Sequence, residues 1–181
     1  MKILIGVDGS QASLDAVRTA GRLVDPADDS VAIYFSPMEL EKRLFGQSRK
    51  VVDGAAAALF EEARDLLPKG FARQPEMICS SKLAAVGILE AAAGWKAEMI
   101  VVGARGHGSV ERLLLGSVSR AVVTGAHLPV LVVRMPPPEG RGLKVLACHH
   151  PASAAAIART ANALHWPADT DARVKIGRAH V

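Results

Sequence analysis

The stretch MKILIGVDGSQASLDAVRTAGRLV, residues 1–24, decides the fold class. It begins with the apolar run Lys2–Val7, continues through the turn Asp8-Gly9-Ser10, and then repeats apolar residues at helical spacing. Ser10 is a suitable N-cap for that helix. A strand that is apolar at nearly every position is typical of a sheet covered on both faces. The stretch therefore predicts the first strand and first helix of a parallel α/β domain.

The same alternation of strand and helix patterns continues to residue 134. We expect further strands over residues 31–35, 73–79, 98–102 and 129–133, and helices over residues 10–24, 51–67, 83–94 and 113–125. Right-handed crossovers between these strands predict a Rossmann-like, doubly wound, five-stranded parallel sheet. Helices on both faces of the sheet complete a three-layer α/β/α sandwich.

The segment after residue 134 predicts a change of domain. Residues 135–142 (MPPPEGRG) are a Pro/Gly-rich linker that continues neither a helix nor a strand. When residues 18–28 are aligned with residues 159–169, seven of the eleven positions are identical. We therefore expect one domain over residues 1–134 and the truncated start of a second copy over residues 143–181.

The last six residues suggest why the second copy is short. Residues 176–181 (IGRAHV) match what one reading frame of a common sequencing-adapter DNA encodes. Our hypothesis is that this segment is adapter-derived and that the natural protein continues. A longer natural gene that diverges near Lys175 would support the hypothesis.

Composition and charge exclude several classes of protein. Half of the 181 residues are hydrophobic and 22% are charged, which excludes a disordered polar chain. The net charge of +4 lies at the C-terminal end, because residues 1–134 carry 16 basic and 15 acidic side chains. With only 4% aromatic residues, no basic and aromatic face for nucleic acid is expected. Two cysteines, no signal peptide and no apolar run of about 18 residues predict a soluble cytoplasmic protein without a membrane segment.

Two glycine-rich loops predict where a ligand binds. In a doubly wound sheet, ligands bind beyond the carboxyl ends of the strands where the strand order reverses. We expect that point between the first and fourth strands, next to the loops 8–10 and 103–108. Gly103 and Gly106 would let the backbone approach a ligand closely. Asp8 accepts hydrogen bonds only, and therefore suits a ribose hydroxyl or an exocyclic amine.

The helix that leads into the fifth strand predicts a phosphate site. Gly116 and Ser117 lie at its start, where N–H groups without helical partners and nearby hydroxyls suit phosphate oxygens. No Gly-Lys-Ser/Thr follows, and a third glycine lies too far away for a dinucleotide fingerprint. Each part also has a plain structural interpretation: Asp8 to Ser10 could be only a turn and cap, and Ser117 and Ser119 could only cap their helix.

These residues resemble the universal stress protein family. The resemblance rests on ILIGVDGS (residues 3–10), IVVGARG (residues 100–106), LGSVS (residues 115–119) and PVLVV (residues 129–133). The spacing G-x2-G-x9-G-[S/T], from Gly103 to Ser117, matches the nucleotide-binding signature of that family without a gap. The resemblance covers Met1 to about Arg134, and tandem two-domain members are a known form of the family.

The resemblance implies an ATP-binding protein, with Mg²⁺ arriving on the phosphates. In that family, the position of Asp8 meets the adenosine, and the position of Ser36 offers an adenine contact through its backbone. The remaining implied binding residues are Val102 and Gly103 for the nucleoside, and Gly106, Gly116, Ser117, Val118 and Ser119 for the phosphates. The resemblance also implies pairing through strand 129–133, either in a homodimer or with a second domain.

At two places the sequence departs from the family pattern, and there the binding residues of the family cannot be assigned to this chain. Many members have a Gly-Asp-Pro-like turn after the third strand, where this chain has residues 80–84 (SSKLA). In the second copy, His149 or His150 replaces the aspartate of the first, so we expect that copy to bind nucleotide poorly.

The site residues predict a nucleotide-responsive regulator and no enzyme beyond slow ATP hydrolysis. They supply no nucleophile with a base and no pair of carboxylates for metal-assisted hydrolysis. No metal site is expected. One alternative is a dimerisation or interaction module that binds no nucleotide. Another is an ATP-pyrophosphatase-type enzyme, although its Ser-Gly-Gly-x-Asp-Ser loop is absent.

Overall fold

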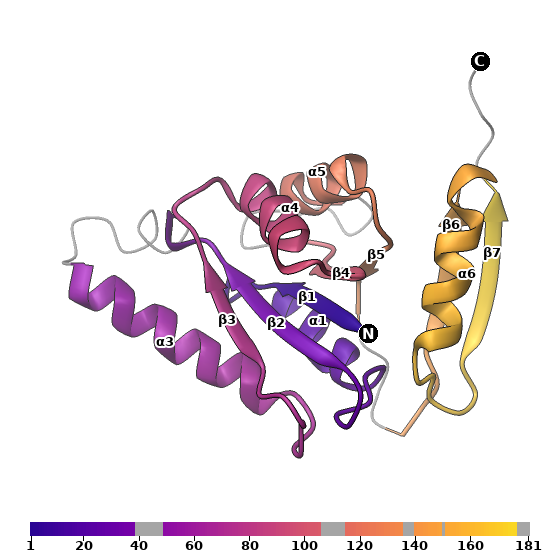
Figure 1. Cartoon of the computed structure of the whole chain (residues 1–181), viewed down its shortest axis with the longest axis horizontal. Helices are drawn as coiled ribbons and strands as arrows, with labels where there is room; N and C mark the ends of the chain where they lie inside the picture. The colour runs from indigo at the N-terminus through magenta and orange to yellow at the C-terminus, as the bar shows by residue number, and fades with distance from the viewer. Residues whose placement is uncertain (39–48, 106–114, 136–139, 150, 177–181) are drawn as a thin grey trace.

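The centre of the molecule is a five-stranded parallel sheet of order β3-β2-β1-β4-β5 (Figure 1). The computed structural model describes residues 1–38, 49–105, 115–135, 140–149 and 151–176. The strands are β1 (Lys2–Gly6), β2 (Ser30–Phe35), β3 (Glu76–Cys79), β4 (Met99–Gly103) and β5 (Val130–Val133). The chain adds β2 and β3 on one side of β1, and then β4 and β5 on the other. The predicted doubly wound sheet is confirmed.

Helices cover both faces of the sheet, as Figure 1 shows. Their bounds are α1 (Gln11–Gly21), α3 (Arg49–Asp65), α4 (Ala84–Trp95) and α5 (Ser117–Gly125). One apolar core lies between the sheet and the pair α1 and α3, and includes Ile5, Val17 and Ile33. A second core lies under α4 and α5, and includes Leu4, Ile88 and Val122. Because neighbouring strand residues point to opposite faces, the continuous apolar strands supply both cores.

The element bounds differ from the predicted ones for local reasons. β3 begins at Glu76 rather than residue 73 because Pro75, just before it, has no N–H for the ladder. α1 begins after the predicted N-cap Ser10, whose hydroxyl accepts a hydrogen bond from the Ser13 amide. The helix expected over residues 113–125 is described only from residue 115 onward, and begins at Ser117.

Residues 143–176 form a separate βαβ arrangement, here named the C-terminal βαβ unit. It consists of β6 (Lys144–His149), a 3₁₀ turn (Pro151–Ser153), α6 (Ala154–Ala163) and β7 (Asp171–Ile176). β6 and β7 pair in parallel as a two-stranded sheet. Its order of elements matches β1, α1 and β2, as the internal repeat predicts. That it begins a second domain stays a prediction.

The C-terminal βαβ unit contacts the end of α1. Leu143 and Leu164 join the core on the α1 and α3 side. The His165 amide donates to the Leu23 carbonyl at 2.9 Å. Leu23 and Leu164 are aligned with each other in the sequence repeat of residues 18–28 and 159–169. Among the described residues, no helix is long and apolar enough to cross a membrane.

Candidate functional site

The reversal of strand order places three loops at one edge of the sheet. β1 lies between β2 and β4, so the loops that follow these three strands begin side by side at their carboxyl ends. Asp8 follows β1, Ser36 follows β2, and Gly103 ends β4. Adjacent strands lie about 4.8 Å apart. The reversal point predicted between the first and fourth strands is therefore present in the fold, and the predicted crevice is the region just beyond it.

Asp8 shapes the loop after β1. One carboxylate oxygen, Oδ1, accepts hydrogen bonds from the Ser10 amide at 2.9 Å and from the Ser10 hydroxyl at 2.6 Å. Gly9 between them has φ +77°, a left-handed conformation that favours glycine. Asp8 is half-buried, so part of the residue remains accessible to solvent. The carboxylate orders the turn that begins α1, in addition to any contact with a ligand.

Gly103 lets α1 pack closely against the end of β4. A Cβ atom at this position would lie 2.6 Å from the Ala12 carbonyl oxygen and 3.0 Å from the Ser13 nitrogen. Both neighbours are backbone atoms, so a side chain would have to push the first turn of α1 away. Sequence reasoning assigned this glycine to ligand approach and missed the helix contact. The first turn of α1 is thereby held beside the crevice.

Val102 presents only its backbone at this edge. Its side chain is buried in the core beneath α4 and α5. It pairs with Gly6 on β1 and with Val132 on β5. A contact between Val102 and a nucleoside, as predicted, would therefore involve main-chain atoms at the end of the strand.

The start of α5 is fastened to the end of β4. Gly116, the N-cap, donates its amide to the Ala104 carbonyl at 2.8 Å. Ser119 is buried, and its hydroxyl lies 2.9 Å from the same oxygen and 3.1 Å from the Gly116 carbonyl oxygen. The Gly116 amide and the Ser119 hydroxyl therefore hold the start of α5 against the end of β4. The alternative that Ser117 and Ser119 cap this helix is wrong, because the N-cap is Gly116 and, among the described residues, no side chain makes a cap hydrogen bond.

The rest of the first turn of α5 suits an anion. Ser117 and Val118 are exposed, and the first amides of a helix have no carbonyl partner within it. The helix dipole adds a partial positive charge at this end. Arg105 is half-buried and its Cα would lie 3.3 Å from a Cβ on Gly116. A phosphate placed here would meet backbone N–H groups and one serine hydroxyl.

Ser36 directs its side chain toward a neighbouring loop. Its hydroxyl is buried and donates to the Lys82 carbonyl oxygen at 2.8 Å, in the loop between β3 and α4. Two residues earlier, the Tyr34 hydroxyl shares a hydrogen bond of 2.9 Å with the Ser80 hydroxyl. Burial raises the pKa of Tyr34 above its ordinary value of 10.0, and the hydrogen bond to Ser80 partly opposes the shift.

Gly106 lies outside the described residues, so its predicted part in the site stays a prediction. The other eight predicted site residues are described, and all lie at or near the carboxyl edge. Within the described part of the chain, no group of three or more histidine, cysteine or acidic side chains could hold a metal ion.

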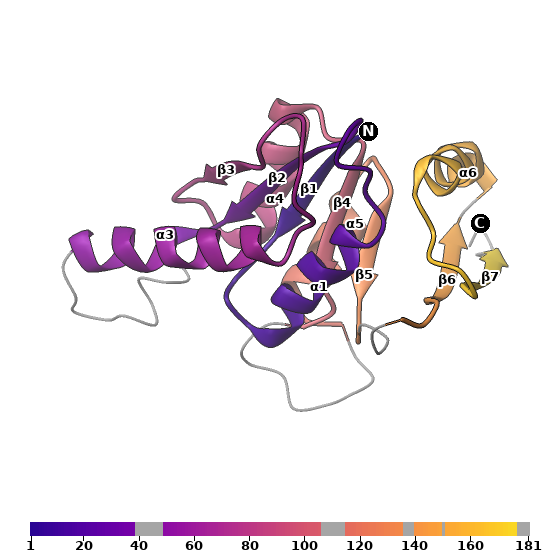
Figure 2. The ribbon, with the colours of Figure 1, turned by 90° about the horizontal axis from the view of Figure 1, so that it is seen from below.

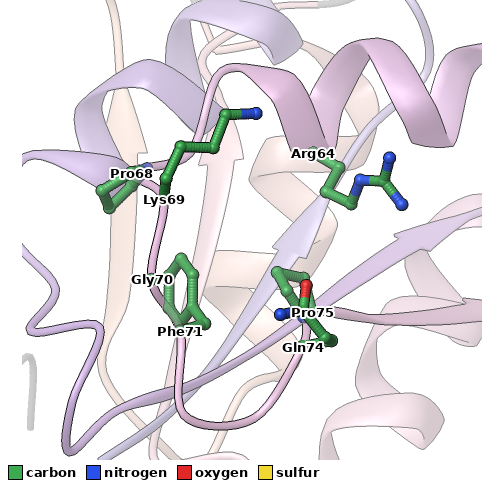
Figure 3. A pocket seen from close by; sticks show the side chains of 7 residues that line it. All are labelled: Arg64, Pro68, Lys69, Gly70, Phe71, Gln74 and Pro75. Atoms are coloured by element: carbon green, nitrogen blue, oxygen red, sulfur yellow. The ribbon is translucent and has the colours of Figure 1, made fainter.

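A different pocket lies at the opposite edge of the sheet, where α3 leads into β3 (Figure 3). It has a volume of about 330 Å³ and is lined by Arg64, Pro68, Lys69, Gly70, Phe71, Gln74 and Pro75. Its two basic groups already have acidic partners, since Lys69 contacts Asp65 at 3.0 Å and Arg64 pairs with Glu61. Sequence reasoning did not single out this place, and its paired charges offer little for a ligand to bind.

Comparison with known proteins identifies relatives of this chain. The family model described as the universal stress protein family matches residues 1–134. A universal stress protein of Methanocaldococcus jannaschii is 35% identical over 147 residues, which cover 76% of this chain and 84% of the relative. A universal stress protein of Thermus aquaticus is 34% identical over 145 residues, covering 73% and 97% of the two chains.

Solved structures share the fold at lower identity. A universal stress protein in complex with cAMP superposes with a TM-score of 0.57 at 24% identity, covering 74% of this chain and 96% of that one. A universal stress protein of Archaeoglobus fulgidus in complex with dAMP has a TM-score of 0.53 at 22% identity, covering 74% and 97%. These likenesses establish the three-layer α/β/α fold.

Proposed function

Because the chain belongs to the universal stress protein family, we propose that it binds an adenine nucleotide in the crevice between β1 and β4. The observation that carries the proposal is the meeting of three features at one edge. These are the acidic turn at Asp8, the glycine end of β4 at Gly103 and the open first turn of α5. An acidic acceptor on one side and N–H donors on the other suit the two ends of a nucleotide.

The ligand class follows from the donors and acceptors available. The carboxylate of Asp8 suits the ribose hydroxyls, and the first-turn amides of α5 with the Ser117 hydroxyl suit the phosphates. Proteins that share the fold have been solved with cAMP, dAMP and AMP, the last from Arabidopsis thaliana. We propose ATP as the ligand of this chain, with Mg²⁺ carried in by its phosphates to offset their charge.

Binding, rather than turnover, is the proposed activity. Asp8 is the one acidic residue among the described site residues, and its Oδ1 is engaged by Ser10. Metal-assisted hydrolysis usually employs more carboxylates than this. We propose a nucleotide-responsive stress regulator of the cytoplasm, in which ATP hydrolysis is at most slow.

A partner is expected at the outer edge of β5. In the described part of the chain, β5 pairs only with β4, so its other edge keeps unpaired backbone groups. Such an edge is a template for another strand. We propose that it pairs with a second copy of the chain or with a second domain.

Calorimetric titration with ATP and AMP tests the proposed function. Gly116→Val is the informative variant, because a Cβ there would already lie 3.3 Å from the Arg105 Cα and 3.4 Å from the Ala104 oxygen. We expect it to weaken ATP binding at least about tenfold, equivalent to about 1.4 kcal/mol. Gly54→Val is the matched control, since a Cβ on this exposed residue of α3 meets nothing within 4 Å.

Two other outcomes would replace the proposal. A folded wild-type protein that binds neither nucleotide would favour the interaction module. Formation of AMP and pyrophosphate from ATP would favour the ATP-pyrophosphatase-type enzyme.

A further inference from the structure

Two hydroxyl groups at the end of β2 hold the loop between β3 and α4. Tyr34 lies in β2, and Ser36 is the first residue after it. Tyr34 bonds to the Ser80 hydroxyl at 2.9 Å, and Ser36 donates to the Lys82 carbonyl at 2.8 Å. We name this pair of contacts the β2 latch.

The fold accommodates the β2 latch through a glycine in α4. A Cβ on Gly87 would lie 1.7 Å from the Tyr34 hydroxyl oxygen and 2.9 Å from the Ser80 hydroxyl oxygen. Any side chain at position 87 would therefore expel the tyrosine hydroxyl from its place. Glycine is unfavourable inside a helix. Its presence at position 87 is explained by the space that the buried Tyr34 hydroxyl requires.

Burial makes the two contacts hard to exchange for water. Tyr34 is 1% exposed and Ser36 is 5% exposed. On its other side, the loop is tied to α4 by an ion pair between Lys82 and Glu90. Residues 81 and 82 are otherwise exposed at the surface. The loop is thus a surface segment whose position is set from within by β2.

The held loop lies on the nucleoside side of the candidate site. The phosphate donors belong to α5, which follows β4, whereas the latch lies at the ends of β2 and β3. β2 and β4 are two strand spacings apart, about 10 Å. A nucleotide with its phosphates at α5 and its ribose at Asp8 therefore extends its base toward Ser36 and the loop.

We propose that the β2 latch fixes the loop of residues 80–82 as the wall of the base-binding end, which makes Tyr34 and Ser36 positioning residues for the adenine nucleotide. This inference rests on the proposed function. It assigns the Ser36 side chain to holding the wall.

The test compares a nucleotide with a phosphate chain that lacks the base. Affinities for AMP and for tripolyphosphate are measured by calorimetry on the full chain and on Ser36→Ala and Tyr34→Phe. Each substitution is expected to weaken AMP binding about five- to tenfold, the effect of losing one hydrogen bond. Tripolyphosphate binding is expected to stay unchanged, because α5 is untouched.

Two further variants separate positioning from folding. Ser30→Ala changes a buried serine at the opposite end of β2, and is expected to keep the wild-type ratio of the two affinities. Ser36→Thr keeps the hydroxyl and is expected to restore AMP affinity. Hydrogen exchange should show faster exchange of the amides of residues 80–82 in Ser36→Ala.

The outcomes distinguish the latch from the proposed function. If wild-type protein binds AMP and both latch variants bind it equally well, the latch inference is overturned while the nucleotide site stands. If the variants weaken AMP and tripolyphosphate equally, their effect is on the fold and the inference also fails. If wild-type protein binds neither AMP nor ATP, the proposed function itself fails.

Discussion

Gly103 packs so closely against α1 that replacing its Hα with a side chain would change the geometry of the site. Gly103→Ala places a methyl group 2.6 Å from the Ala12 carbonyl oxygen, where only a backbone shift can relieve the overlap. We predict a loss of about 1–3 kcal/mol in the free energy of unfolding, as for other overpacked positions. Urea denaturation followed by circular dichroism measures the loss.

The matched control is Gly94→Ala, on the exposed side of α4. A Cβ there meets nothing within 4 Å, so alanine is expected to stabilise the protein by roughly 0.5–1 kcal/mol. Equal effects of the two substitutions would contradict the packing role assigned to Gly103.

Tyr34 is the one tyrosine in the chain, which makes its titration observable by itself. Burial raises its pKa above 10.0, the value it takes when unfolded. The unfolded chain therefore loses its proton first as the pH rises, and the free energy of unfolding falls from about pH 10 upward through the folded pKa. Below pH 10 this contribution is fully present.

Tyrosinate absorbance of the folded protein should give a midpoint above that of the denatured chain. Tyr34→Phe should remove the part of the alkaline loss of stability that belongs to this group. A folded-state midpoint at or below 10 would contradict the buried, hydrogen-bonded position of the phenol.

At the scale of elements, the C-terminal βαβ unit is held to the main body by few contacts. α6 has no buried residue, whereas Leu164, just after it, is only 9% exposed and packs with the core beside α1. We predict that Leu164→Ala weakens this docking by about 2 kcal/mol or more. Hydrogen exchange should then become faster in β6 and β7, and stay unchanged in β1 and β4.

Leu146→Ala is the control for that prediction, because Leu146 lies on β6 and is 61% exposed. It should leave exchange in the unit close to wild type. Faster exchange across β1 and β4 in Leu164→Ala would show instead that the unit and the main sheet unfold together.

The sequence predicted elements best where the information is local. The apolar strands, the N-cap at Ser10 and the turn at Gly9 depend on residues close together in the chain, and the structure has all of them. Right-handed crossovers predicted a doubly wound sheet with helices on both faces, whereas the strand order is known from the structure. The start of β3 was missed by three residues because the strand pattern was read across Pro75.

The parts of the site that escaped prediction depend on residues far apart in the chain. Gly103 contacts Ala12, and Ser36 contacts Lys82, 46 positions away. The sequence alone does not tell whether a glycine allows close approach of a ligand or close packing of a helix. Likewise, a serine after a strand does not reveal whether its hydroxyl faces the ligand or a neighbouring loop.

At the scale of the whole molecule, the two edges of the sheet have different chemistry. The carboxyl edge gathers Asp8, Gly103 and the open end of α5, while the amino edge carries the pocket beside Phe71 with its paired charges. The helices extend along both faces between these edges, as Figure 2 shows from below.

Mapping amide chemical shifts by NMR during titration with AMP and ATP tests the central claim most directly. We expect the amides of residues 8–10, Ser36, Gly103 and residues 117–119 to shift, while those of residues 69–74 stay in place. Shifts confined to the pocket at residues 64–75, or none at saturating nucleotide, would contradict a nucleotide site between β1 and β4.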